Sequence, residues 1–474
     1  MAYSFTELGE YVKVQGGFAY KSKDFQETGG NPVLKIKNVR FGNVNYSETA
    51  YISDELAHQT KDWETREGDV LISMTGSGPN APQSLVGRVA RVWGNEPTAY
   101  INQRVGRIKL KKELDIDLDF LFYLLSMPKS QEFLVSNSSG SANQANISSK
   151  IIESLPCPVV EYEVSKKIAI ILRSIDEKIR LNRQINATLE QMAQALFKSW
   201  FVDFDPVIDN ALDTGNPIPA ALAAKGEQRK QLREAVAKGE AEVPTLPDDI
   251  RSLFPSEFEF TEEMGWIPKG WSIQAIDELI QLTGGGTPKT TIDKYWNGDI
   301  PWFSVVDAPS ETDVFVVDTE KHVTQAGIDN SSTKILRPGT TIISARGTVG
   351  KCALVAAPMT MNQSCYAVNG RGEYSDEFVY YLIRYQVSGL QQRSHGSVFS
   401  TITRDTFKSI RVPASNSKVT NKYSAVVKPL FDKILSNLRC SRELEMTRDT
   451  LLPKLISGEL QIPEAEKLAA EALN

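Results

Sequence analysis

The sequence predicts an α+β protein in which two globular domains are joined by two long antiparallel coiled-coil helices, as a pseudo-twofold internal repeat. Two observations carry this prediction. Short β-type runs separated by turn residues fill two regions, and a sustained heptad pattern of apolar residues follows each region. Matching motifs also recur in the same order in both halves of the chain. A chain of 474 residues has room for two or three domains.

Six collinear matches define the repeat. The run GDVLISMTGS aligns with GTTIISARGT, and a glycine-rich segment precedes each run. The aligned pairs are 16–20 with 284–288, 68–77 with 339–348, 101–103 with 361–363, 120–125 with 378–383, Gly140, Ser141 and Ile147 with Gly396, Ser397 and Ile402, and 152–158 with 407–413. Chance does not produce six matches in one order, so the chain is interpreted as two divergent copies of one unit.

The first part of each copy is expected to be a globular domain. Runs such as 31–39 and 302–306 are β-type, and turn residues separate them. A short helix with an apolar face is expected at 118–126 and again at 376–384. The predicted organisation is a domain over 1–160, a central helix over 161–204, a charged linker over 205–270, a second domain over 271–415, a distal helix over 416–460 and an acidic tail over 461–474.

The second part of each copy is expected to be one long helix. Residues at alternating spacings of four and three form a seam over roughly five heptads. The seam holds Ile168, Leu172, Ile175, Ile179, Asn182, Asn186, Leu189, Leu196 and Trp200 with Phe201 beside it, and then Leu430, Ile434, Asn437, Ser441, Leu444, Arg448, Leu451 and Leu455. Polar seam residues cost stability but fix register and partner. If the two helices run antiparallel, the polar residues meet near the centre of the seam; the alternative is that each helix packs only on its own domain.

The linker carries most of the charge. The net charge is −6, and 205–270 alone accounts for −6, while 1–160 and 271–415 carry −1 each and 161–204 and 416–474 carry +1 each. The acidic balance therefore does not exclude a nucleic-acid partner for the domains. One helical patch is expected within the linker, at 220–239, and the alanine-rich tail is compatible with a short helix.

Composition limits the class of protein. No apolar run reaches the roughly 18–20 residues of a membrane span, and the N-terminus lacks the features of a signal peptide, so a cytoplasmic protein without a membrane partner is expected. The four cysteines are scattered and are interpreted as reduced, semi-buried thiols. The three histidines lie far apart, so no metal site is expected.

Catalytic motifs are not found in the sequence. It has no GxxxxGK[ST] phosphate loop and no HExxH metal motif. It also lacks the NPPY or DPPY motif of amino-methyltransferases, and no convincing carboxylate–lysine cluster of a nuclease occurs. Neither catalytic residues nor a cofactor is therefore expected in this chain.

Architecture suggests a DNA partner instead. Two similar domains on helices of about 36 residues, roughly 54 Å long, suit duplex DNA, whose turn is about 34–36 Å. The repeated glycine-spaced loops, 72–78 and 343–350, are then equivalent positions on two readers. Candidate DNA-binding residues are Gly16, Gly17, Lys21, Ser77, Arg88, Asn102, Gln103, Arg104, Asn143 and Gln144, and Thr287, Lys289, Arg346, Thr348, Lys351, Asn362, Gln363, His395 and Ser397. Ordinary turn chemistry is the alternative for each of them.

These residues resemble the specificity (S) subunit of type I restriction–modification systems over nearly the whole chain. The resemblance rests on LTGGGTP at 282–288, ISARGTVG at 343–350 with the Asn362–Gln363 pair, and the block from Gly396 to Ile402. It also rests on LFKSWFVDFDP at 196–206, GWIPKGW at 265–271 and LLPKLISGEL at 451–460. The segment 205–250 is longer and more charged than the resemblance leads one to expect, and is interpreted as an insertion.

The resemblance implies a non-catalytic subunit that recognises a bipartite, gapped target in double-stranded DNA. It implies two modification subunits that methylate adenine with S-adenosylmethionine, and two restriction subunits that use ATP and Mg. Docking of the methyltransferases is expected at Phe197, Trp200, Phe201 and Phe204, and the alternative is that these side chains close the core of the helix pair. The alternative function is a scaffold or decoy that binds the methyltransferase without DNA specificity.

Overall fold

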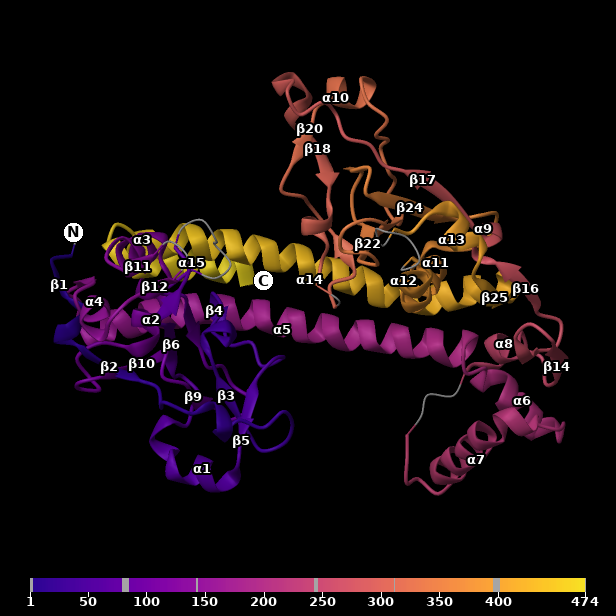
Figure 1. Ribbon diagram of the computed structural model, residues 1–474, viewed down its shortest axis with the longest axis horizontal. Helices are drawn as coiled ribbons and strands as arrows, with labels where there is room; N and C mark the ends of the chain where they lie inside the picture. Colours follow the sequence, from indigo (N-terminus) through magenta and orange to yellow (C-terminus); the bar gives the residue numbers. More distant parts are fainter. Residues whose placement is uncertain are drawn as a thin grey trace. The chain divides into compact units, whose positions relative to one another are not determined.

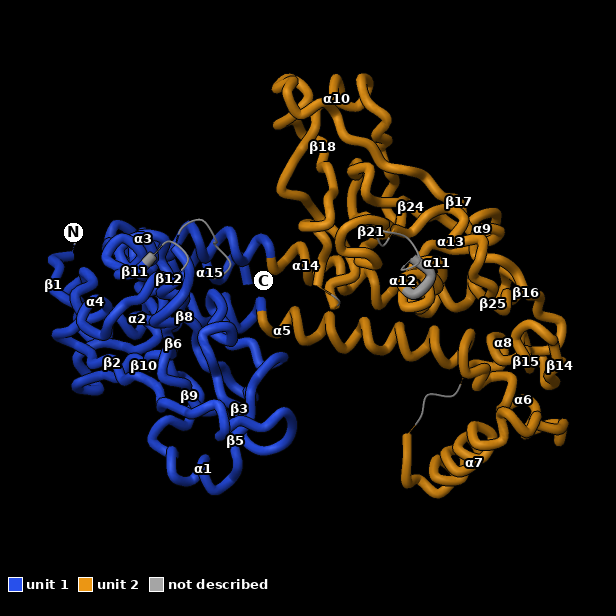
Figure 2. The backbone as a smooth tube through the Cα atoms, in the orientation of Figure 1, with its two compact units in different colours: residues 1–179, 442–474 blue, residues 180–441 orange. Residues whose placement is uncertain are grey.

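The computed structural model describes residues 3–78, 85–141, 144–242, 246–310, 312–394 and 401–473 (Figure 1). The chain forms two compact units (Figure 2). Unit 1 is Met1–Ile179 with Arg442–Asn474, and unit 2 is Arg180–Ser441. Each unit contains one globular domain and one part of each long helix, α5 (Tyr162–Phe201) and α14 (Ser417–Ser457).

The five-stranded sheets of the two globular domains have the same topology, strand for strand. The five-stranded sheet has the order β2-β10-β6-β8-β4 in unit 1 and β17-β24-β21-β22-β19 in unit 2. The unit 1 strands are β2 (Val12–Gly16), β10 (Val105–Leu110), β6 (Val70–Ser73), β8 (Val89–Arg91) and β4 (Gly42–Asn43). Those of unit 2 are β17 (Ile280–Gly284), β24 (Cys365–Gly370), β21 (Thr341–Ser344), β22 (Cys352–Val355) and β19 (Phe315–Val316). The last strand of each order pairs parallel with its neighbour, and the other neighbours in both sheets are antiparallel.

A smaller sheet and an outer strand pair also recur. The three-stranded sheet is β5-β3-β9 in unit 1 and β20-β18-β23 in unit 2, with one antiparallel and one parallel pairing in each. Its strands are β5 (Ala50–Ile52), β3 (Asn31–Leu34) and β9 (Tyr100–Ile101), then β20 (His322–Val323), β18 (Trp296–Phe303) and β23 (Thr360–Met361). The outer pairs are β1 (Phe5–Glu7) with β13 (Pro156–Pro158) and β16 (Ser272–Ala275) with β25 (Arg411–Ala414). The internal repeat and the predicted fold class are confirmed.

The central strand of each five-stranded sheet is buried on both faces. All four residues of β6, Val-Leu-Ile-Ser, are buried, and so are the four of β21, Thr-Ile-Ile-Ser. A strand covered on both sides has a continuous apolar run rather than an alternating one. The predicted short helices pack on these sheets: α2 (Leu118–Ser126) contacts β6 and β8, and α11 (Asp376–Tyr385) contacts β21, β22 and β24.

The long helices run antiparallel where they meet within each unit (Figure 1). In unit 2 the Asn182 amide donates to the Ser441 hydroxyl (3.2 Å), and the Asn437 amide donates to the Asn186 Oδ1 (2.9 Å). Nearer the end of α5, the Tyr423 hydroxyl donates to the Ala193 carbonyl (3.0 Å). The partner number falls as the α5 number rises, which is the antiparallel order. The predicted pairing of polar seam residues is therefore confirmed.

The seam residues are buried almost throughout. Leu189, Leu196 and Leu430 are half-buried, and the other predicted seam positions apart from Arg448 are buried. Beside Leu430, the neighbouring Phe431 turns into the core, 3% exposed, and contacts Tyr381 with ring centroids 5.8 Å apart. The heptad count placed Leu430, and not Phe431, at the buried position. It did so because the globular domain, as well as α5, packs against this part of α14.

The asparagine pair provides a test of the seam. We expect Asn437→Leu to destabilise unit 2 by about 1–3 kcal/mol, because Asn186 then keeps a buried Oδ1 that has lost its donor. The double substitution Asn186→Leu with Asn437→Leu should regain much of that loss, because leucine at both positions removes the unsatisfied group. Urea unfolding of the single and double variants measures both effects. Additive losses in the double variant would contradict the pairing.

The charged linker is more ordered than predicted. It contains α6 (Asp205–Thr214), α7 (Ala223–Ala237), α8 (Asp248–Arg251) and a hairpin of β14 (Phe258–Thr261) and β15 (Gly265–Pro268), where only one helix was expected. Pro206 in the first turn of α6 and Gly215 at its end, with φ of 73°, are the sequence signals that identify this helix. Beyond the linker, α15 (Ile462–Leu473) forms in the acidic tail.

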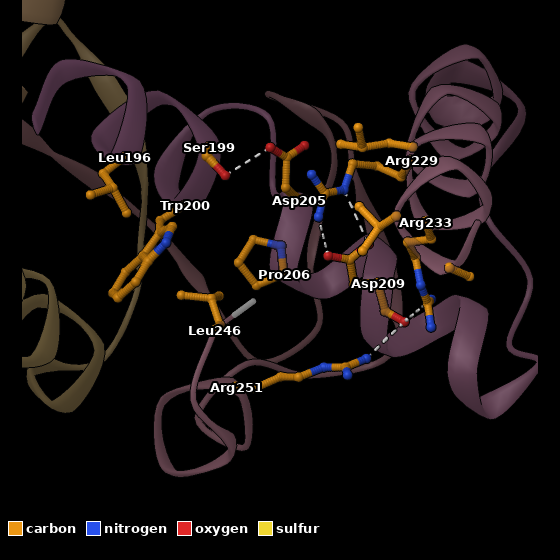
Figure 3. A pocket seen from close by; sticks show the side chains of 13 residues that line it. Leu196, Ser199, Trp200, Asp205, Pro206, Asp209, Arg229, Arg233, Leu246 and Arg251 are labelled. Carbon is orange, nitrogen blue, oxygen red and sulfur yellow. Dashed lines mark hydrogen bonds and ion pairs between the residues drawn. The ribbon is translucent and has the colours of Figure 1, made fainter. Parts of the chain in front are cut away.

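Ion pairs attach α7 to α6. Asp209 pairs with Arg229 (Figure 3). Asp213 pairs with Arg233 and also with Arg251 of α8. α7 has one buried residue, Gly226, so apolar burial contributes little to its attachment. A cavity of about 360 Å³ remains between the end of α5, α6 and α7, with Trp200 in its lining (Figure 3).

No helix in the described part of the chain combines the length and the apolar character needed to cross a membrane.

Candidate nucleic-acid interface

A glycine-rich segment and an Asn-Gln turn come together in each unit. In unit 1 the Gly17 N–H donates to the Val105 carbonyl (2.9 Å) and the Phe18 N–H donates to the Ile101 carbonyl (2.9 Å). The same two bonds recur in unit 2, from Gly285 to Cys365 (3.3 Å) and from Gly286 to Met361 (3.0 Å). Two of the predicted loops therefore form one surface in each copy.

Glycine is required where these segments meet. A Cβ on Gly17 would lie 2.1 Å from the Asn102 carbonyl oxygen, and one on Gly285 would lie 1.9 Å from the Asn362 carbonyl oxygen. The preceding glycines, Gly16 and Gly284, have open space at that position. The repeated Gly-Gly pair thus contains one glycine needed for close approach and one that is not.

This contrast gives a matched prediction. We expect Gly285→Ala to lower the stability of unit 2 by about 1–3 kcal/mol, because the methyl group must push two backbone segments apart. The control variant Gly284→Ala should change the free energy of unfolding by less than about 0.5–1 kcal/mol. Thermal unfolding measures both variants, and equal losses would contradict the close approach.

A serine at the end of the central strand closes the second loop. The Ser73 hydroxyl accepts from the Arg88 N–H (3.0 Å), and the Ser344 hydroxyl accepts from the Lys351 N–H (2.9 Å). The Ser344 carbonyl also accepts from the Gly350 N–H (2.9 Å). The loop uses these N–H groups internally, so the run 343–350 is a strand-to-strand turn and not a phosphate cradle built from them.

The three loops are joined by equivalent backbone bonds. The Met74 N–H donates to the Arg104 carbonyl (2.9 Å), and the Ala345 N–H donates to the Ser364 carbonyl (2.7 Å). Ile147 and Ile402 bind to the same loops: the Ile147 N–H donates to the Met74 carbonyl (3.0 Å), and the Ile402 N–H donates to the Ala345 carbonyl (3.0 Å). We call the surface formed by the glycine-rich segment, the Asn-Gln turn and the loop after the central strand the three-loop surface.

Most of the candidate DNA-binding residues lie on this surface or beside it. Gly16, Lys21, Gln103, Arg104 and Gln144 are exposed in unit 1, as are Lys289, Arg346, Thr348, Lys351 and Gln363 in unit 2. Gly17, Ser77, Asn102, Thr287 and Asn362 are half-buried. Asn143, His395 and Ser397 lie outside the described residues. Exposed lysine and arginine suit contacts with phosphate, and arginine and amide side chains can also reach base edges.

Arg88 is a correction to the sequence prediction. It is 2% exposed, and its guanidinium donates to the carbonyls of Val39, Leu85 and Ile36, each at 2.8 Å. Burial lowers the pKa of this guanidinium. The side chain holds loops of its own domain together and does not face a ligand. Lys351, its counterpart in unit 2, is exposed.

The two asparagines shape the turns. The Asn102 Oδ1 accepts from the Gln103 N–H (2.6 Å), and the Asn362 Oδ1 accepts from the Ser364 N–H (2.9 Å). Turn chemistry, the alternative stated for these residues, thus describes Asn102 and Asn362. Gln103 and Gln363 are the amides presented on the surface.

The proposed docking aromatics belong to the core of unit 2. Phe197, Trp200, Phe201 and Phe204 are each at most 7% exposed. Their ring centroids lie 5.9 Å from Tyr381, 5.8 Å from Tyr423, 4.9 Å from Phe378 and 5.6 Å from Trp271, in that order. The prediction that they dock a partner is wrong, because burial leaves these rings unavailable, and the alternative, closure of the core, holds.

A buried charge network in unit 1 was not recognised in the sequence. Asp176 of α5 accepts from the Arg448 guanidinium of α14 (2.7 Å) and from the Tyr123 hydroxyl of α2 (2.8 Å). Burial and the nearby Asp176 carboxylate raise the pKa of Tyr123 well above its ordinary value. Arg448 is the one charged residue in the predicted seam. A charged residue at a seam position was therefore the sequence signal for a buried ion pair.

Unit 2 has a related connection. Glu190 of α5 accepts from Arg384 of α11 (2.8 Å), and the Tyr381 hydroxyl donates to the Glu190 carbonyl (3.3 Å). Tyr123 and Tyr381 are equivalent in the repeat. In each unit, therefore, a tyrosine hydroxyl joins the globular domain to α5. The Glu190–Arg384 ion pair does the same in unit 2, whereas the Asp176–Arg448 pair of unit 1 joins α5 to α14. In the described ranges, no three His, Cys, Asp or Glu side chains are grouped to hold a metal.

Comparisons with known proteins agree with this architecture. The family model described as "Type I restriction modification DNA specificity domain" matches residues 2–191 and, a second time, 268–438. The HindI specificity subunit of a type I restriction enzyme from Haemophilus influenzae is 30% identical over 362 residues, covering 72% of this chain and 77% of that protein. The MjaIX specificity subunit from Methanocaldococcus jannaschii is 29% identical over 194 residues, covering 40% of this chain and 45% of that protein.

A solved structure supports the fold. The S subunit of a type I restriction–modification system from M. genitalium has a TM-score of 0.53 and 15% identity, with 96% of both chains covered. The two matched ranges of the family model contain both three-loop surfaces, and the ion-paired helices α6 and α7 lie between the ranges. The chain therefore belongs to the family of type I restriction–modification specificity subunits, and it carries two copies of the DNA specificity domain.

Proposed function

We propose that this chain recognises a bipartite, gapped DNA target, one half with each three-loop surface. The observation that carries the proposal is the pair of equivalent surfaces, matched backbone bond for backbone bond, that expose different side chains. Arg346 and Lys351 are exposed in unit 2, whereas Thr75 and Arg88, at the equivalent positions of unit 1, are buried. Equivalent frames with unlike side chains suit two unlike half-sites.

Partners supply the chemistry in this proposal. Specificity subunits are non-catalytic, and the enzymatic activity lies in other subunits of the complex, so the chain is not itself an enzyme. Two modification subunits with S-adenosylmethionine and two restriction subunits with ATP and Mg are the expected partners. The exposed flanks of α5 and α14, rather than their buried aromatic ends, are the docking surface that we propose for the modification subunits.

Base-modification sequencing tests the proposal directly. DNA from cells that express this chain with its modification subunit should show N6-methyladenine in both halves of one gapped motif. If both proteins are soluble and co-purify but no new motif appears, the alternative of a scaffold or decoy replaces this function. The modification subunit expressed alone is the control.

The long helices are proposed to set the gap. An insertion of four residues in one of them adds about 6 Å of rise. We expect a longer gap with both half-sites unchanged, read by the same sequencing. Four residues inserted after Leu473, beyond α15, form the matched control and should leave the gap as it is. An unchanged gap in a folded helix variant would contradict the proposal that the long helices set the gap.

A further inference from the structure

Two candidate residues of unit 2 lie beside the last bond that joins two neighbouring strands. β21 and β24 pair antiparallel up to Ser344 opposite Cys365, and the next bond joins Ala345 to Ser364 at 2.7 Å. Arg346 directly follows Ala345, and Gln363 directly precedes Ser364, so both residues lie next to this bond. Both side chains are exposed. An arginine and a glutamine thus flank one backbone bond of the three-loop surface.

A third residue orients the glutamine. The Thr287 hydroxyl, from the glycine-rich segment, donates to the Gln363 Oε1. Thr287 is half-buried, and its segment is fixed by the Gly285 and Gly286 backbone bonds. The bond distinguishes the two ends of the amide: the oxygen is turned to Thr287 and keeps one further lone pair, and the nitrogen keeps its two donors. A side chain ordered before binding loses less entropy on binding.

Unit 1 lacks this arrangement at the equivalent positions. Gln103 is exposed like Gln363, but the residue in the place of Arg346 is Thr75, which is buried and donates to the Asn146 Oδ1 (2.8 Å). Ala19 occupies the place of Thr287, so no hydroxyl is present there. The two copies therefore differ in their donors at the same point of the same frame.

We propose that Arg346 and Gln363 are the base-reading pair of unit 2, with Thr287 as a positioning residue, an inference that rests on the proposed function. Arg346 takes guanine, through its O6 and N7 acceptors in the major groove. Gln363 takes an adjacent adenine, through N6 and N7. Both contacts are bidentate, so the planar fork of arginine matters and its charge alone does not suffice.

The test uses the full chain with its modification subunit and base-modification sequencing as the readout. Gln363→Ala should relax one base position in one half-site, by about tenfold or more in relative modification of matched and mismatched sites. Arg346→Lys keeps the charge but should relax the neighbouring position by a similar factor. The other half-site should be unchanged in both variants, and Gln103→Ala should change only that other half.

Matched controls lie at the other end of β24 and on β17, its neighbour in the sheet. Arg371 follows β24 and Gln281 lies in β17, and both are exposed. Arg371→Ala and Gln281→Ala remove the same side-chain types from the same sheet, and they should leave both half-sites unchanged. For Thr287, the valine variant should weaken discrimination at the Gln363 position only, and the serine variant should restore it, because serine keeps the hydroxyl.

The outcomes distinguish a failure of the base-reading pair from a failure of the proposed DNA-recognition function. If the unaltered chain yields no gapped motif, the proposed function fails. If the unaltered chain yields a motif and Gln363→Ala and Arg346→Ala both leave it intact, the base-reading pair is overturned. Uniformly weaker modification by Arg346→Ala, with full recovery by Arg346→Lys and unchanged base preference, would make Arg346 a phosphate contact and overturn its assignment as well.

Discussion

Replacing Asp176 with alanine is expected to destabilise unit 1 by on the order of 3 kcal/mol. The Asp176 carboxylate accepts from Arg448 and Tyr123, and its side chain is 11% exposed. Removing one partner of a buried ion pair leaves the other charge without compensation, which costs more than the pair contributes. Urea unfolding measures the loss in the free energy of unfolding. Hydrogen exchange of the amides of 162–179 in α5 then shows whether the loss arises in unit 1.

A double-mutant cycle separates the pair from its surroundings. Arg448→Ala alone should also be costly, because it leaves the Asp176 carboxylate, whose side chain is 11% exposed, without its cation. The double variant should lose less than the sum of the two single variants. Asp449 is the control: it also pairs with Arg448 at 2.8 Å but is 65% exposed, so Asp449→Ala should cost less than about 1 kcal/mol. Additive losses would show that Asp176 and Arg448 do not act as a pair.

Replacing Trp200 with alanine is the second large effect, with an expected loss of about 3–5 kcal/mol from unit 2. Trp200 is 1% exposed, and its ring lies 5.3 Å from Phe254 and 5.8 Å from Tyr423, centroid to centroid. These rings come from α5, the linker and α14, so removing the indole opens a void that no single segment can close. Chemical denaturation of the purified chain measures the loss.

The control lies on the same helix. Met192 is 50% exposed, and Met192→Ala should change the free energy of unfolding by about 0.5 kcal/mol or less. Should Trp200→Ala retain full stability and fail only to bind a partner subunit, the core assignment would be wrong and the docking prediction would return.

Local patterns allowed the sequence to predict the repeat and the seam. Alternating spacings identify a coiled coil without knowledge of its partner, and the antiparallel order then determines which polar residues meet, as Asn186 and Asn437 do. The α6 helix was missed although Val207, Ile208 and Ala211 form a buried apolar face, because a helix of 10 residues shows only a short stretch of apolar periodicity.

Contacts between residues distant in the sequence determine which candidate residues are exposed on the site. In the sequence, Arg88 and Arg346 are equally plausible as residues that contact DNA. Only the structure shows that the Arg88 guanidinium donates to the carbonyls of Ile36 and Val39 inside its own domain. The role of Trp200 was open for the same reason, since its neighbours Phe254 and Tyr423 are distant in sequence. The Thr287–Gln363 contact depends on a close approach of two loops that glycine makes possible, and no spacing rule predicts it.

The composition of unit 1 has a consequence for synthesis on the ribosome. Its helix partner, 442–474, is translated after all of unit 2. At 5–20 residues per second, the nascent N-terminal domain waits roughly 13–50 s for the segment that covers the apolar face of its half of α5. A message truncated after unit 2 would yield a chain whose second unit is whole and whose first unit lacks Arg448 and the end of α14. The two units therefore become whole in the reverse of the order in which their globular domains are made.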